Sequence, residues 1–143
     1  MVTGLSTPDF PLYHSGTAGI ATNSTGDKWI FPVPFKANVM RFGLTVQGSS
    51  ANATAAVIAL DHRITAGSDT GRVELLVISK TASVSQQGKF LYQDPATSIA
   101  VDEGDELVVE VTTADGAANA MTPVVILRQI PEVAGNNSAM VAA

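Results

Sequence analysis

Residues 40–47 read MRFGLTVQ, and this stretch decides the fold class because apolar and other side chains alternate along it with a period of two. Successive side chains of an extended strand point to opposite faces, so the period predicts a half-buried β-strand. The predicted apolar face carries four side chains: Met40, Phe42, Leu44 and Val46.

Short runs of the same kind continue from Trp29 to Pro131, at residues 29–35, 56–61, 73–78, 89–93, 106–113 and 123–130. Between them lie turn sequences rich in Gly, Asp and Ser, at residues 48–50, 67–71, 94–95, 102–105 and 114–116. None of the runs has the period of a helix. We therefore expect an all-β fold: a single antiparallel β-sandwich, jelly-roll-like, with seven or eight strands.

Two of these patterns also predict where a strand lies. In residues 29–35 the aromatic and aliphatic side chains alternate with Pro32 and Pro34. Two prolines spaced by two residues lack N–H donors on the same edge, so this segment should be an edge strand or an extended connector. Residues 56–61 and 73–78 are apolar on both faces, which indicates that an outer face of the sandwich is also covered.

A chain of 143 residues has the size of one domain. Residues 1–27 are rich in Gly, Ser, Thr and Pro and show no sustained period, so we expect an extended N-terminal arm there. Its apolar side chains, Phe10, Leu12 and Tyr13, are the candidate interface anchors. The β-sandwich should span residues 28–133, and residues 134–143 should form a short C-terminal tail.

Composition argues against several classes of function. Eight Lys and Arg residues and a net charge of -5 do not supply the cationic field that nucleic acid requires. The absence of cysteine excludes disulfides and thiolate metal clusters. The longest apolar run, residues 55–60, is far shorter than a membrane span, and no secretory leader is recognisable, so we expect a soluble, unexported chain.

Charged residues make up 15% of the chain, where about 25% is usual. Small neutral residues suit a permanent protein contact better than a free surface, so the low charge favours an oligomer.

An acid, a base and a cation adjoin only at Asp61-His62-Arg63. Adjacent strand residues face opposite ways, which prevents a direct Asp61–His62 dyad, and we expect His62 to lie at a strand end. No G-x-S-x-G elbow is present. Glu106 and Glu110 should share one solvated strand face rather than oppose each other as in a glycosidase. We expect no enzyme and no cofactor.

Two further patterns allow more than one interpretation. The run Asp102, Glu103, Asp105 and Glu106 offers oxygen ligands for calcium, but its spacing departs from an EF-hand loop and suits a turn that opens a strand. Aromatic residues could form a sugar-stacking platform from Tyr13, Trp29 and Tyr92, although Trp29 belongs to an inward-facing row and is expected in the core.

The segments KFLY (89–92), IAVDEGDELVVEV (99–111) and PVVIL (123–127) together resemble head decoration (cement) proteins of tailed bacteriophages. The resemblance implies a jelly-roll-like body on the outer capsid surface of the virion, made in the host cytoplasm, often trimeric, and bridging capsomers through contacts with the major capsid protein. It carries no catalytic residues. The alternative is a receptor- or carbohydrate-binding module of a phage tail or a bacterial surface protein.

Overall fold

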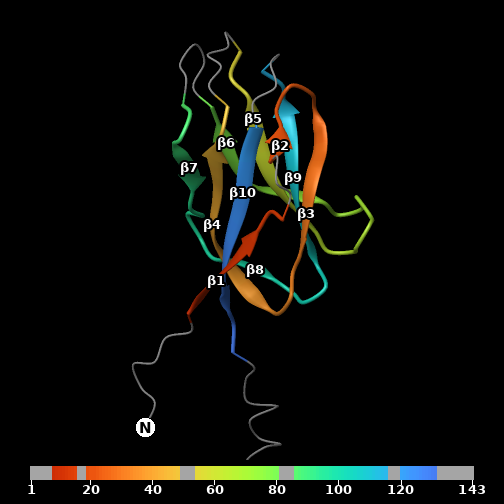
Figure 1. The fold of residues 1–143 in the computed structure, drawn as a ribbon. Coiled ribbons are helices and arrows are strands. Elements are labelled where there is room, and N and C mark those ends of the chain that lie inside the picture. The colour runs from red at the N-terminus through yellow and green to blue at the C-terminus, as the bar shows by residue number, and fades with distance from the viewer. Residues whose placement is uncertain (1–7, 16–18, 49–53, 81–85, 116–119, 132–143) are drawn as a thin grey trace, which may run out of the picture.

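A computed structural model describes residues 8–15, 19–48, 54–80, 86–115 and 120–131, and all regular structure in these ranges is β. Two antiparallel sheets pack face to face as a sandwich (Figure 1). The prediction of an all-β, jelly-roll-like sandwich is confirmed. The part of the chain that is described contains no helix long and apolar enough to cross a membrane.

The first sheet has six strands in the order β1-β10-β4-β7, with β2 also paired to β10 and β8 also paired to β4. Its strands are β1 (Asp9–Tyr13), β2 (Ile20–Ala21), β4 (Ala37–Val46), β7 (Phe90–Gln93), β8 (Ile99–Val101) and β10 (Ala120–Gln129).

The second sheet has four strands in the order β3-β9-β5-β6, formed by β3 (Gly26–Pro32), β5 (Val57–Arg63), β6 (Val73–Ser79) and β9 (Glu106–Thr113). The chain crosses between the two sheets at most of its connections, as in a jelly roll.

The described residues contain ten strands, where the sequence predicted seven or eight. The additional strands are short: β1, β2 and β8. Each pairs along one side of a ten-residue strand, β10 or β4, which offers more backbone hydrogen-bonding groups than one short neighbour can use. β2 and β8 have two and three residues, which are too few for an alternating pattern to be recognised.

The predicted arm over residues 1–27 needs correction where the chain is described. Residues 9–13 pair with β10 over the register Asp9↔Arg128 to Tyr13↔Val124, and β3 already begins at Gly26. Main-chain pairing along an open sheet edge, rather than a hydrophobic pattern, places β1 there. Residues 1–7, 16–18 and the predicted tail, 134–143, lie outside the described residues.

The core lies between the sheets. Phe42, Leu44 and Val46 are buried in it, as the alternation predicted. Met40 is the exception, because a β-bulge intervenes: Arg41 pairs with Ile126 whereas Leu127 pairs with Val39. The extra residue reverses the alternation, so Val39 enters the core in place of Met40.

The edge-strand prediction for residues 29–35 is confirmed, since β3 lies at the edge of the four-stranded sheet. Phe31 and Val33 are buried, while Pro32 and Pro34 are exposed. A strand that lacks alternate N–H donors can pair on one side only, and β9 occupies that side.

Candidate interaction surface

The three candidate anchors, Phe10, Leu12 and Tyr13, do not all point to the same face of the sheet. Directly paired strand residues share a face, and Phe10 and Leu12 pair with the buried residues Leu127 and Val125. Leu12 packs against the core, and the ring of Phe10 meets Phe35 edge-on at a centroid distance of 5.2 Å. Tyr13 points the other way and is 70% exposed. Leu12 is therefore used by its own fold, and Tyr13 lies on the outer face.

The outer face of the six-stranded sheet is built from rows of paired residues. One row crosses the whole sheet, because Tyr13 pairs with Val124, Val124 with Gly43, and Gly43 with Tyr92. The neighbouring rows are Pro11, Ile126 and Arg41 on one side, and Thr122, Thr45 and Phe90 on the other. Arginine is the only ionisable type among these residues besides tyrosine, so the face is mainly apolar and aromatic.

Four of these residues form an aromatic platform: Arg41, Gly43, Phe90 and Tyr92. Gly43 is buried beneath the ring of Phe90, and a Cβ at position 43 would overlap the Phe90 Cζ. The rings of Phe90 and Tyr92 stack with centroids 5.8 Å apart, and the Arg41 guanidinium lies 4.0 Å from the Tyr92 centroid. Phe90 and Tyr92 are nevertheless 43% and 54% exposed. Their contacts hold them in place while much of each side chain remains open to a partner.

The charges around the platform are paired. Arg41 donates to both oxygens of Asp94 at 2.6 and 2.9 Å, and this hydrogen bonding lowers the pKa of Asp94 and raises that of Arg41. At the far end of the same face, Arg128 donates to Asp9 at 2.9 Å. The face therefore carries balanced ion pairs rather than a net charge.

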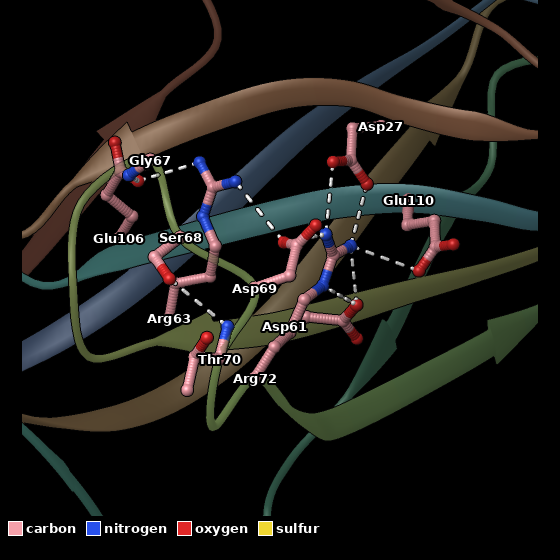
Figure 2. A network of polar contacts seen from close by, with 10 residues as sticks. All are labelled: Asp27, Asp61, Arg63, Gly67, Ser68, Asp69, Thr70, Arg72, Glu106 and Glu110. Carbon is pink, nitrogen blue, oxygen red and sulfur yellow. Dashed lines mark hydrogen bonds and ion pairs between the residues drawn. The ribbon is translucent and has the colours of Figure 1, made fainter.

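The outer face of the four-stranded sheet is different, because a group of seven charged residues covers it (Figure 2). We call it the Arg72 cluster: Asp27, Asp61, Arg63, Asp69, Arg72, Glu106 and Glu110. Arg72 donates to four carboxylates, at 2.7 Å to Asp61, 2.7 and 3.0 Å to Asp27, 3.0 Å to Asp69 and 3.1 Å to Glu110. Five carboxylates against two guanidiniums give this face an acidic character.

The cluster also fixes the connection between β5 and β6. Arg63 donates to Glu106 at 2.7 Å, and the Gly67 N–H donates to the same Glu106 oxygen at 2.8 Å. Glu106 and Glu110 do share one strand face, as predicted. They are half-buried in ion pairs, however, and the expectation of a solvated surface there is corrected.

The neighbours in Asp61-His62-Arg63 point to opposite faces, as expected. Asp61 and Arg63 join the Arg72 cluster, whereas His62 Nε2 lies 2.7 Å from Asp105 Oδ2. Asp105 also accepts the Asp102 N–H at 2.9 Å, so this carboxylate shapes the turn before β9. The sequence did not reveal the His62–Asp105 pair or the role of Arg72, because their partners are distant in the chain.

The acidic run at residues 102–106 forms that turn. Within the described residues, no group of three or more His, Asp or Glu side chains is arranged to hold a metal ion. The proposed sugar platform is not assembled either, since Trp29 packs against the core and its ring meets His14 at 4.2 Å. Tyr13 and Tyr92 share the outer row, with Val124 and Gly43 between them.

Comparison with known proteins identifies the fold. No protein family matches the chain, and no curated protein matches it in sequence. A solved structure described as an Eiger TNF from S. frugiperda superposes with a TM-score of 0.57, covering 91% of this chain and 97% of the other at 13% identity. At that identity the likeness shows a shared jelly-roll sandwich and nothing about function.

Proposed function

We propose that this chain is a structural virion protein that assembles into a homo-oligomer, with a trimer favoured, and stabilises a phage capsid from its outer surface by bridging capsomers. The observation that supports the oligomer is the mainly apolar and aromatic outer face of the six-stranded sheet. Tyrosine and arginine on a rigid, apolar surface are the residue types that dominate the binding energy of protein interfaces. The capsid setting rests on the sequence resemblance of residues 89–92, 99–111 and 123–127 to decoration proteins.

The low charge of the whole chain supports the same conclusion. Only 15% of the residues are charged, and seven of them are concentrated in the Arg72 cluster on the opposite face. The face with the aromatic platform is thereby left mainly apolar, with two balanced ion pairs, and a free surface of this kind favours association.

A glycan-binding module is the second candidate, because such a module also exposes aromatic side chains. Stacking on a sugar requires a free ring face. Phe90 precedes Tyr92 on β7, whereas Arg41 bonds to Asp94, which follows it, so the two neighbours reach Tyr92 from opposite ends of the strand. These two contacts leave less of the Tyr92 ring free to stack on a sugar, so the platform favours a protein partner.

The first test is the native mass of the purified protein at micromolar concentration. We expect a trimer, and we expect the double variant Tyr13→Ser/Tyr92→Ser to be a monomer with unchanged circular dichroism. Ile64→Ser is the matched control, since Ile64 is an equally exposed apolar residue, at 59%, on the connection after β5. A wild-type monomer, or a trimer that survives the double substitution, would refute assembly through this face.

The second test concerns the capsid. Heads of the encoding phage that lack the protein should bind it and withstand heating better once it is added, because several contacts on one oligomer act together. The double variant should bind much more weakly. A trimer that neither binds nor stabilises the heads would refute the capsid function but not the oligomeric assembly. Binding of the protein to a glycan array would favour the second candidate function.

A further inference from the structure

The hydrogen bonds of the Arg72 cluster leave one buried acceptor without a donor. A guanidinium has five N–H groups. In Arg72 the Nε–H serves Asp61, the two Nη1 hydrogens serve Asp27 and Asp69, and the two Nη2 hydrogens serve Asp27 and Glu110. All five are used.

Asp61 is 5% exposed, and its Oδ1 has no hydrogen-bond partner in the structure. An unsatisfied charged oxygen at this depth is costly, so a donor is required. The second arginine does not supply it: the Nη groups of Arg63 are directed to Glu106 and Asp69, and its buried Nε–H makes no hydrogen bond.

Glu110 on β9 is the neighbour placed to supply the donor. Its carboxylate and that of Asp61 approach the same Arg72 Nη2, at 3.1 and 2.7 Å. Burial and the adjacent Asp61 raise the pKa of Glu110 above its ordinary 4.5, and Arg72 only partly offsets this effect. A protonated Glu110 has an O–H to donate, whereas an ionised one adds a fourth negative charge around Arg72.

Some of the other charged groups near Glu110 disfavour its ionisation and one favours it. Asp27 on β3, Asp61 on β5 and Asp69 on the β5–β6 connection disfavour its ionisation, and Arg72 favours it. Glu74 on β6 pairs with Asp61 across the strands and adds to the negative charge. A metal ion in place of the proton is disfavoured, because no three ligating side chains of the described residues converge there.

We propose that Glu110 holds a proton that it donates to Asp61, and that this proton acts as a pH-sensitive latch that holds the β5–β6 connection on the four-stranded sheet. Below the raised pKa, Glu110 donates to Asp61 Oδ1 and the cluster is complete. As the pH rises, the proton is released to solvent, the carboxylates around Arg72 repel one another, and the connection that carries Asp69 and Arg72 loosens. The latch does not depend on the proposed capsid function.

The sign of the effect follows from the raised pKa. The unfolded chain gives up the Glu110 proton near the ordinary value, while the folded chain retains it to higher pH. Folding stability from this group is therefore full in acid and falls as the pH passes from the unfolded to the folded pKa.

The test is a titration of the Glu110 carboxyl carbon by NMR in the full chain. We expect a midpoint above 4.5 that falls in Asp61→Asn, because the neighbouring negative charge is lost. Two results would overturn the proposal. One is a midpoint that stays at the ordinary value in the wild type, and the other is a Glu110 carboxyl signal that shifts when calcium is added and does not shift with pH.

Glu110→Gln provides a second measurement, because an amide N–H₂ can donate to Asp61 at every pH. We expect this variant to lose less stability than the wild type between pH 4 and pH 8, and to slow the intrinsic-rate-corrected hydrogen exchange of the Gly67 amide at pH 8. Glu103→Gln, in the exposed turn outside the cluster, is the matched control and should follow the wild type. Parallel behaviour of all three proteins would contradict a proton held by Glu110.

Discussion

The two outer faces of the sandwich differ in what holds them together. The six-stranded sheet presents an aromatic platform with balanced ion pairs at its margins, whereas the four-stranded sheet carries the partly buried Arg72 cluster, in which five carboxylates surround two guanidiniums. An apolar face gains free energy when a partner covers it, while a clustered charge network holds its own loop and repels a like-charged copy. The comparison teaches that one face suits assembly and the other suits internal organisation.

The largest expected effect concerns the acidic face. Replacement of Arg72 by methionine leaves the buried Asp61 carboxylate without its cation, so we expect a loss of about 3 to 5 kcal/mol in the free energy of unfolding at pH 7. Urea denaturation measures it. Arg128→Met removes the exposed pair with Asp9 and should cost roughly 1 kcal/mol or less. Equal losses in the two variants would break the contrast between the faces.

The next effect concerns association through the apolar face. Tyr92→Ser should weaken oligomer formation by about 2 kcal/mol, or roughly 30-fold, because a central aromatic side chain contributes most to such interfaces. Sedimentation equilibrium measures the dissociation constant. Thr112→Ala, at an exposed position on the opposite sheet, should leave it unchanged. A similar loss in both variants would mean that the assembly surface is elsewhere.

A smaller effect should follow from Gly43→Ala. The new methyl group would displace the Phe90 ring, and we expect about 1 kcal/mol of destabilisation together with loss of the Phe90–Tyr92 stacking. The ring-current shifts of the two side chains in NMR spectra report the stacking. Thr112→Ala, at an exposed position on the opposite sheet, should preserve these shifts. Unaltered ring signals in the glycine variant would show that the platform does not depend on Gly43.

The smallest expected effect is the acid response of two exposed carboxylates, one on each face. Hydrogen bonds from Arg41 lower the pKa of Asp94, and those from Arg72 and Arg63 lower that of Asp69. Each ion pair stabilises the fold above the ordinary value of 3.8, and the contribution is lost as the pH falls through the lowered pKa. Between pH 5 and pH 2, the melting temperature should therefore fall slightly less in Asp94→Asn and in Asp69→Asn than in the wild type. Melts that match the wild type would show that the pairs contribute nothing.

The sequence determined the all-β class, the buried rows of β4, β5 and β9, and the edge position of β3. These features follow from alternation and from Pro32 and Pro34, which act within a few residues of chain. The direction of Tyr13 and of the Phe90–Tyr92 pair, by contrast, depends on register: these side chains share one face because β1 pairs with β10, β10 with β4, and β4 with β7.

Only the tertiary structure decided the partners of the charged residues. Arg72 meets Asp27 and Glu110 from strands that are 45 and 38 residues away, and Asp105 meets His62 across 43 residues. It also decided that Leu12 packs against the core and that a bulge removes Met40 from the core. Local patterns specify which way a side chain points relative to its neighbours in the chain, whereas electrostatic contacts depend on distances in space that only the packed sheets create.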